Sequence, residues 1–411
     1  MRVLVLSQYY PPEPDPKIHA LGRDLQTRGH RVRVITGYPN YPQGRIYPGW
    51  RQRPWQRTSL DGLDVVRLPL YPDHSRSAVR RSLNYLSFAA SASVLGPFLS
   101  GPADAMWVYS APLTIGIPAW WTGAWRGIPF VFNIHDMWPE TVAATGILNE
   151  GRIVRLLERL GRFIYRTAAE VTVVSPGFRR LLIAKGVPED KVHFIANWAD
   201  EEIYHPVPRD EGLAARHGLA GRFNVVYGGN IGAAQALETL LEAAARLRDL
   251  PSVQFVLIGE GVEEKRLRAR ASALGLDNVR FIGWQPEALM PAFFALADVV
   301  VMHLRREPLF EITVPGKAYA YLACGRPILC AVAGDTADIV RDAGAGVTCP
   351  PEDPAALARA VRALRAMPEP ERRAMGESGH RAHLAKYSRA ALVGRHEALL
   401  VQAARSRKER S

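Results

Sequence analysis

Short apolar runs alternate with longer amphipathic stretches along the whole chain. Apolar runs of this kind are typical of strands buried on both faces of a parallel sheet, and the stretches between them show helical spacing. The pattern therefore predicts repeated strand–helix units and an α/β fold. The predicted strands form two series, 3–6, 32–36, 65–68, 106–109, 130–134 and 171–174, then 224–227, 253–258, 279–282, 299–302, 328–331 and 346–348.

A stretch rich in proline and charge, 196–221, separates the two series and is typical of a linker. We therefore predict two doubly wound, Rossmann-like domains, 1–200 and 201–387, facing each other across a cleft. Ligands of such folds bind at the carboxyl ends of the strands, so the cleft is the expected site. Helices are predicted between the strands, for example at 18–28, 153–167, 237–247, 263–274, 355–366 and 372–386.

Positive charge is unevenly distributed over the 411 residues. The formal net charge is +12, and the segment from Lys17 to Arg57 contains nine lysine or arginine residues but only one acid, Asp24. This asymmetry indicates an anionic partner: nucleic acid, a phospholipid surface or a phosphorylated substrate. No nucleic-acid-binding module accompanies the charge, so nucleic acid is not the predicted partner.

The three cysteines, Cys324, Cys330 and Cys349, do not have zinc-ligand spacing, and no histidine or carboxylate cluster does. We therefore expect neither a metal nor another cofactor. The odd number of cysteines, with a first strand beginning at Arg2 and no signal peptide, predicts a reducing, cytoplasmic location.

The segment 303–327 follows a predicted strand and leads into a predicted helix near Pro315-Gly316-Lys317. Free amides at a helix start, with a lysine beside them, are suited to a phosphate group. An ordinary helix start with a solvated lysine is the alternative.

A glycine-rich turn supports the first interpretation. Gly228, Gly229 and Gly232 follow the strand 224–227, and glycine allows the backbone to approach an anion closely. Together with Lys317 this turn predicts a diphosphate site. Two later strands end at Glu260 and at Ile282-Gly283, which either line a base pocket or form simple turns.

His135 and Asp136 end the strand 130–134, where the pair is a candidate for binding or proton transfer. The alternative is that Asp136 caps a helix predicted to start near residue 137 and that His135 is packed.

The stretch 83–99 is mostly apolar, follows Arg80-Arg81 and is too short to span a bilayer. With the tryptophans Trp120, Trp121 and Trp125 it suits a membrane interface, although buried core helices would explain it equally.

Eight motif-like stretches follow one another along almost the whole chain: SQYYPPEPDPKIHALGRDLQTRGHRVRVITGYPNYPQGRIYPG, FNIHDMWPE, TVVSPGF, IANWAD, VVYGGNIGAAQALETLLEAA, IGEG, VRFIGW and PLFEITVPGKAYAYLACGRPI. In this order they resemble the glycosyltransferase family 4 enzymes of GT-B fold, and most closely the bacterial O-antigen, capsule and colanic-acid subgroup. The resemblance implies retaining transfer from a nucleotide sugar, with the acceptor bound by the first domain and the nucleotide by the second. It also implies that residues 388–411, a helix at 390–404 followed by a basic tail, cross back to the first domain.

The chain departs from the family pattern at the diphosphate and ribose positions. Asn230 and Gln235 stand near the places of the usual arginine and lysine, which leaves Lys317 as the main phosphate cation. Ala320 occupies the place of the glutamate that grips the ribose. Glu311, next to the place of the family's other glutamate, could reach the sugar, and an inactive or altered enzyme also stays open.

The prediction is a metal-independent glycosyltransferase of cell-surface polysaccharide (lipopolysaccharide O-antigen) synthesis, peripheral on the inner face of the cell membrane and bound to its anionic surface. It moves a hexose or N-acetylhexosamine from a UDP-sugar, in preference to a GDP-sugar, to a polyprenyl-diphosphate-linked acceptor. Amides from Gly229 to Ala233 and the Lys317 ammonium stabilise the departing diphosphate, which takes the acceptor's proton. The alternatives are a non-hydrolysing UDP-sugar 2-epimerase and a non-catalytic scaffold of a glycan assembly complex. The predicted catalytic residues are His135, Asp136 and Lys317, and the predicted nucleotide-sugar-binding residues are Gly228, Gly229, Asn230, Gly232, Gln235, Glu260, Ile282, Gly283, Glu311, Pro315, Gly316 and Lys317.

Overall fold

The computed structural model describes residues 1–14, 16–75, 77–138, 140 and 151–408. Contacts divide the chain into two compact units. The N-terminal unit comprises Met1–Ile195 and Val393–Ser411, and the C-terminal unit comprises Ala196–Leu392. The predicted domain limits were 200 and 387.

An eight-stranded sheet, in the order β3-β4-β2-β1-β5-β6-β7-β8, forms the centre of the N-terminal unit. Neighbouring strands are parallel except β3 and β4, which are antiparallel. The six predicted strands are confirmed. The polar edge strand β3 and the three-residue β8 were missed, because neither contains a long apolar run. The strands are β1 Arg2–Leu6, β2 Arg31–Gly37, β3 Gln56–Leu60, β4 Leu63–Leu68, β5 Ala105–Ser110, β6 Phe130–Ile134, β7 Glu170–Val173 and β8 Val192–Phe194.

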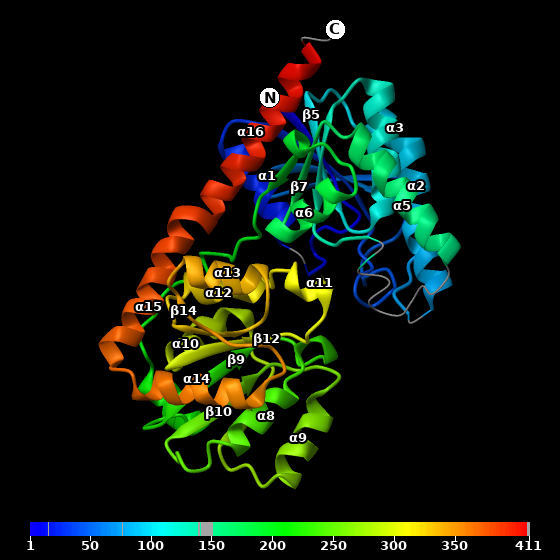
Figure 1. Ribbon diagram of the computed structural model, residues 1–411. Helices are drawn as coiled ribbons and strands as arrows, with labels where there is room; N and C mark the ends of the chain where they lie inside the picture. Colours follow the sequence, from blue (N-terminus) through cyan, green and yellow to red (C-terminus); the bar gives the residue numbers. More distant parts are fainter. Residues whose placement is uncertain (15, 76, 139, 141–150, 409–411) are drawn as a thin grey trace. The chain divides into compact units, whose positions relative to one another are not determined.

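Helices cover both faces of this sheet, with α1 and α16 on one side and α2, α3 and α5 on the other (Figure 1). Helix α16 is fixed to the sheet by a hydrogen bond of 3.3 Å from Trp107 Nε1 to His396 Nδ1. The helices are α1 Lys17–Thr27, α2 Ala78–Leu99, α3 Gly116–Arg126, α5 Gly151–Thr167, α6 Pro176–Ala184 and α16 Arg389–Lys408.

Helix α2 contains the stretch 83–99 that had two interpretations. Its inner face is buried at Asn84, Phe88 and Ala92, while Leu86 and Phe98 are exposed on the other face. The segment is therefore packed on the sheet along one side only. In the described part of the chain, no helix has the length and apolar character needed to cross a membrane.

Six parallel strands in the order β11-β10-β9-β12-β13-β14 form the sheet of the C-terminal unit. All six predicted strands are confirmed. The strand order reverses between β9 and β12, which is where doubly wound sheets open a crevice at the carboxyl ends. The strands are β9 Phe223–Gly228, β10 Val253–Ile258, β11 Val279–Gly283, β12 Val299–His303, β13 Ile328–Ala331 and β14 Gly346–Thr348.

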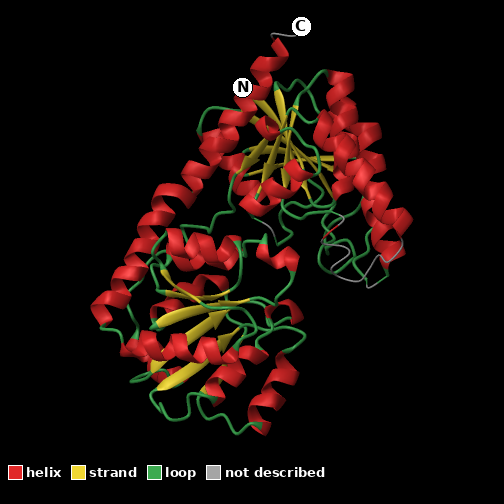
Figure 2. Ribbon diagram, viewed as in Figure 1, coloured by secondary structure: helices red, strands yellow, loops and turns green. Residues whose placement is uncertain are grey.

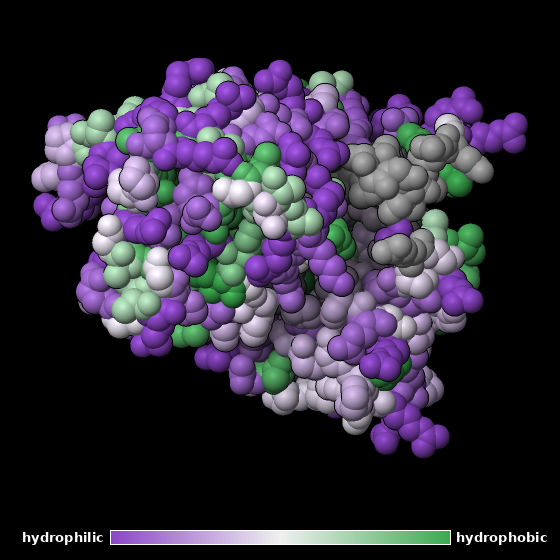
Figure 3. All heavy atoms as spheres, turned by 90° about the horizontal axis from the view of Figure 1, so that it is seen from below, coloured by the Kyte–Doolittle hydropathy of each residue, from purple (hydrophilic) through white to green (hydrophobic). Residues whose placement is uncertain are grey.

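Residues of α8, α9 and α14 pack on one face of the second sheet and form a continuous apolar core. Figure 2 shows the sheet strands lying between helices. Figure 3, viewed from the side of α9 and α14, shows mostly hydrophilic side chains. The helices are α7 Glu211–His217, α8 Glu238–Ala245, α9 Glu264–Ala273, α10 Met290–Ala295, α11 Pro308–Glu311, α12 Gly316–Ala323, α13 Asp335–Asp342, α14 Pro354–Ala366 and α15 Glu369–Ala382.

Candidate active site

Lys317 lies where the glycine turn after β9 meets the start of α12. Pro315 precedes the helix, and Lys317 is its second residue. A Cβ atom placed on Gly229 would lie only 3.0 Å from Lys317 Nζ. The ammonium also donates a hydrogen bond of 2.6 Å to Tyr227 Oη. The structure therefore brings together the two stretches that the sequence predicted to share a phosphate.

No acid in the described part of the chain balances the charge of Lys317. The side chain is half-buried, and no described carboxylate forms an ion pair with it. Burial lowers the pKa of Lys317 from 10.5 to about 7. An ammonium in this state gains stability when an anion arrives, because the anion replaces the lost hydration.

Close backbone packing explains several glycines of the neighbouring turns. A Cβ atom on Gly259 would lie 2.0 Å from Gly229 O, and one on Gly261 would lie 2.2 Å from Ile231 O. Gly229 and Gly259 also adopt φ angles of +132° and +135°. Only glycine fits these positions, so the turns after β9 and β10 pack backbone to backbone.

Most amides of the glycine turn are already used inside the protein. The prediction that the amides from Gly229 to Ala233 stabilise a departing diphosphate is therefore wrong for three of these five amides. Among the described residues, only the N–H groups of Asn230 and Ala233 in this stretch make no hydrogen bond. The other three, of Gly229, Ile231 and Gly232, donate to Ile258 O, Glu260 O and Gln235 Oε1 at 2.9, 2.8 and 3.1 Å.

Two tyrosines that the sequence analysis missed hold the turn in place. Tyr227 Oη donates to Asn230 O at 2.6 Å, and Tyr321 Oη accepts from the Gly228 N–H at 3.0 Å. Burial raises the pKa of both phenols, so they stay neutral. Both residues look like core positions in the sequence, because one ends a strand and the other lies within a helix.

His303, at the end of β12, is a third residue that was missed. Its Nδ1–H donates to Gln235 O at 2.8 Å, and its Nε2 accepts from the Glu352 N–H at 3.0 Å. A neutral imidazole with its proton on Nδ1 makes both hydrogen bonds. Burial lowers the pKa of His303, which favours this neutral form. The imidazole thereby ties the glycine turn to the loop before α14.

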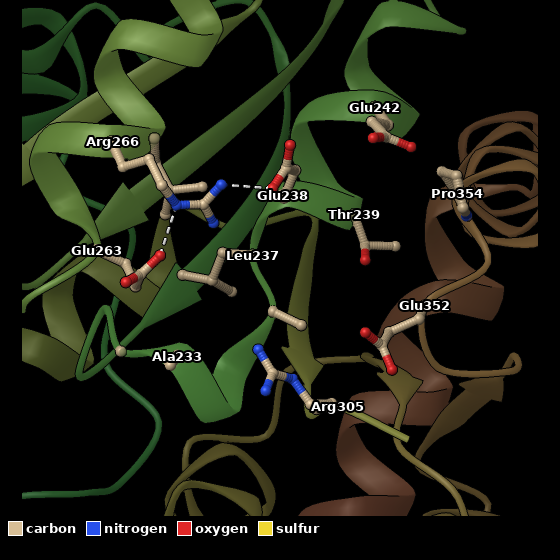
Figure 4. Close-up of a pocket in the computed structure, with 13 residues that line it drawn as sticks. Ala233, Leu237, Glu238, Thr239, Glu242, Glu263, Arg266, Arg305, Glu352 and Pro354 are labelled. Carbon is tan, nitrogen blue, oxygen red and sulfur yellow. Dashed lines mark hydrogen bonds and ion pairs between the residues drawn. The ribbon is translucent and has the colours of Figure 1, made fainter. Parts of the chain in front are cut away.

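A cavity of about 270 Å³ lies against the glycine turn, on the side of α8 and α9. Figure 4 shows Arg266 held by Glu238 and Glu263, with Arg305 and Glu352 nearby. Four glutamates and two arginines line this space, so its net charge of −2 disfavours a diphosphate. The Lys317 side of the turn is the better phosphate site.

The other predicted binding residues lie at neighbouring strand and helix ends. Glu260 and Glu311 have exposed side chains. Gly283 O accepts from the Gly259 N–H at 2.9 Å, which joins the ends of β10 and β11. Ala320 is 7% exposed and offers no side-chain acceptor for a ribose hydroxyl.

His135 and Asp136 follow β6 in the N-terminal unit. The His135 ring packs 4.5 Å from the Tyr109 ring, and no hydrogen bond joins His135 to Asp136. Burial, and secondarily the charge of Lys17, keep the pKa of His135 well below its ordinary value. Asp136 keeps solvent contact, yet the protein atoms around it raise its pKa. The helix predicted to follow lies largely outside the described residues.

Two family models match the chain. One describes a glycosyl transferase 4-like domain and covers residues 15–198, and the other describes glycosyl transferases group 1 and covers residues 222–366. The chain belongs to the family 4 glycosyltransferases.

Among the described residues, no group of three histidine, cysteine or carboxylate side chains is placed to hold a metal ion.

Relatives of this glycosyltransferase include the probable glycosyltransferase WbjE of Pseudomonas aeruginosa, which is 31% identical over 57% of this chain and 59% of that protein. The putative colanic acid biosynthesis glycosyl transferase WcaI of Escherichia coli K12 is 28% identical over 79% of this chain and 82% of its own.

Solved structures confirm the predicted GT-B fold. Sucrose-phosphate synthase from Thermosynechococcus elongatus superposes with a TM-score of 0.72 at 18% identity over 98% of both chains. HepE of Anabaena, solved with UDP-glucose, superposes with a TM-score of 0.68 at 17% identity over 100% of both chains.

Proposed function

We propose that this glycosyltransferase moves a hexose or N-acetylhexosamine from a UDP-sugar to a polyprenyl-diphosphate-linked acceptor in cell-surface polysaccharide synthesis. One observation carries the proposal: the ammonium of Lys317, which no described carboxylate pairs, lies against the glycine turn after β9. The names of WbjE and WcaI support the polysaccharide context, and the UDP-glucose complex of HepE supports the donor class.

The catalytic work of this site is electrostatic. As the C1–O bond to the diphosphate breaks, negative charge grows on the leaving oxygen, and the Lys317 ammonium together with the Asn230 and Ala233 amides stabilises it. The departing diphosphate takes the proton of the acceptor hydroxyl, and the acceptor oxygen bonds to C1 on the same face of the sugar that the diphosphate leaves. The anomeric configuration is then retained without a covalent intermediate and without a metal.

His135 is proposed to hold the donor sugar. Its lowered pKa keeps the imidazole neutral at pH 7, so one nitrogen can donate to a sugar hydroxyl while the other accepts. Because no hydrogen bond joins it to Asp136, we assign the carboxylate no orienting role and keep it as a candidate base. His135→Ala should lower turnover with little change in the binding of UDP, which lacks the sugar.

The proposal is tested by a thermal-shift screen of UDP- and GDP-sugars, followed by product analysis with a polyprenyl-diphosphate-linked saccharide. A shift by UDP-sugars and an acceptor-dependent product with retained configuration are expected. Absence of any nucleotide-induced shift would overturn the proposal. Sugar conversion without acceptor would instead identify a 2-epimerase.

A second candidate is a non-catalytic scaffold, because Ala320 removes the side chain that would accept a bond from the ribose. Titration calorimetry separates the two: measurable UDP binding favours the enzyme, and its absence favours the scaffold. Ala320→Glu should strengthen UDP binding if the ribose lies beside this position, by about tenfold for one hydrogen bond to a charged group.

A further inference from the structure

Exposed large apolar side chains are concentrated on three helices of the N-terminal unit. Helices α2, α3 and α5 have 22, 11 and 17 residues, yet they carry ten of the seventeen such side chains in the described part of the chain. Soluble surfaces rarely gather apolar groups in this way without a partner. The ten are Val79, Leu83, Leu86, Val94, Phe98, Trp121, Trp125, Ile153, Leu156 and Phe163.

The apolar residues are ordered along each helix. On α2, exposed apolar side chains recur every three or four residues from Val79 to Phe98, so they form one stripe opposite the buried face. On α5, Ile153, Leu156 and Phe163 form a similar stripe. The Cβ direction in a helix keeps such residues on one side, so both stripes are continuous faces.

Aromatic rings connect the three helices. Phe98 of α2 packs 5.3 Å from Trp125 of α3, and Trp125 packs 5.8 Å from Trp121, measured between ring centroids. Trp120 lies 6.0 Å from Trp121 and 5.1 Å from Phe163 of α5. We call these five residues the aromatic strip. It makes the stripes of α2, α3 and α5 one surface.

Arginines lie beside this apolar surface. The three helices contain eight arginines and a single acid, Glu158, so they account for +7 of the net charge of +12. None of the eight forms an ion pair with a described carboxylate. On α5 the arginines recur every three or four residues, one position before the apolar stripe. The eight are Arg80, Arg81, Arg126, Arg152, Arg155, Arg159, Arg162 and Arg166.

We propose that α2, α3 and α5 form a docking face for the surface of a bilayer that carries anionic headgroups. Tryptophan and phenylalanine are suited to the headgroup–acyl boundary, and unpaired arginines are attracted to anionic phosphate. A second copy of the chain fits this face poorly, because a two-fold contact would bring +7 against +7. Nucleic acid would leave the aliphatic stripe of α2 exposed.

The test is co-sedimentation of the full chain with vesicles of phosphatidylcholine alone or mixed with phosphatidylglycerol. We expect binding to the anionic vesicles that weakens as salt rises. Phe98→Ala/Trp125→Ala should lower the partition coefficient by about tenfold, because two large exposed rings are removed. The matched control is Trp55→Ala, which removes a ring that is 53% exposed outside these helices.

Charge is tested separately. Arg155→Glu/Arg159→Glu/Arg162→Glu should weaken binding to anionic vesicles by more than about a hundredfold, while lysine at the same three positions should keep it within about twofold. Absence of wild-type binding to anionic vesicles, equal binding to neutral ones, or binding that survives both sets of substitutions would refute the docking face. A dimer in light scattering that Trp125→Ala dissociates would assign the face to a second copy instead. UDP binding, measured alongside, reports on the proposed function independently.

Discussion

Replacing Lys317 by methionine removes the ammonium but keeps a long, unbranched side chain beside Tyr227. The structure predicts two opposite consequences of this change. The ligand-free protein should become more stable, whereas diphosphate binding and turnover should be lost. The two effects have one cause, because a half-buried cation that no described carboxylate pairs is unfavourable until an anion arrives.

The effect on stability follows from the pKa of Lys317, which is about 7 in the folded protein against 10.5 as the ordinary value. Below pH 7 the ammonium is charged in both states, and its burial opposes folding by up to roughly 5 kcal/mol. Between the two pKa values the unfolded chain holds more protons, so this penalty shrinks as pH rises. Lys317→Met should therefore raise the midpoint of thermal unfolding at pH 6, and raise it less at pH 9.

The effect on the donor has the opposite sign. An ammonium about 4 Å from one phosphate charge contributes about 4 kcal/mol at an effective dielectric constant of about 20. Removing one such contact from a developing oxyanion typically costs about 2–4 kcal/mol of barrier, which is about 30- to 1,000-fold in turnover. UDP affinity of the wild-type protein should also fall as pH rises above 7, because the free ammonium then loses its proton.

Calorimetry with UDP, turnover assays and thermal unfolding at pH 6 and pH 9 measure these effects. Lys265→Met is the matched control, because Lys265 is an exposed lysine on α9 of the same unit. Unchanged turnover and UDP affinity in Lys317→Met would refute the phosphate-binding role. If Lys317→Met instead lowered the unfolding midpoint at pH 6, the Lys317 ammonium would be stabilised in the folded protein, which would contradict the unfavourable burial inferred here.

Three further changes probe the supports of the site. Gly229→Ala should weaken UDP binding by about tenfold in calorimetry, because its Cβ would lie 3.0 Å from Lys317 Nζ and its φ of +132° disfavours a side chain. Gly275→Ala, at φ +60° with open space around it, is the control for a glycine substitution away from Lys317, and equal UDP affinity in both variants would contradict the packing argument. His303→Leu leaves Gln235 O and the Glu352 N–H unpaired, which should lower the free energy of unfolding in urea by about 1–3 kcal/mol for each lost hydrogen bond. An unchanged urea midpoint would show that His303 does not tie the glycine turn to the loop before α14. Burial lowers the pKa of His396 to about 3, so folding favours the neutral imidazole, and the free energy of unfolding should decline as pH falls from about 6.5 toward 3. His396→Phe should flatten this decline in unfolding curves measured at several pH values. An unaltered slope would assign the acid sensitivity to other groups.

Residues with purely local signals were predictable. Buried parallel strands need apolar side chains on both faces, so twelve strands were recognisable as apolar runs, whereas the polar edge strand β3 was not. The family motifs placed Lys317 and the glycine turn on the same ligand. The roles of Tyr227, Tyr321 and His303 were not predictable, because each of them bonds at least one partner that is distant in the chain, namely Lys317, Gly228 and Gln235 respectively. In the sequence, all three residues look like core positions.

The sequence by itself therefore determined the α/β pattern and the GT-B family, and it singled out Lys317 as the cation proposed for the phosphate site, since periodicity and motifs are properties of neighbouring residues. Only the tertiary structure decided which amides of the glycine turn are already bonded, that no described carboxylate pairs with the Lys317 ammonium, and that Phe163 of the arginine-rich helix α5 packs against Trp120 of α3. These facts depend on how β9, β10 and α12, or α2, α3 and α5, pack against one another. Packing of distant segments sets hydrogen-bond partners and desolvation, which no local pattern records.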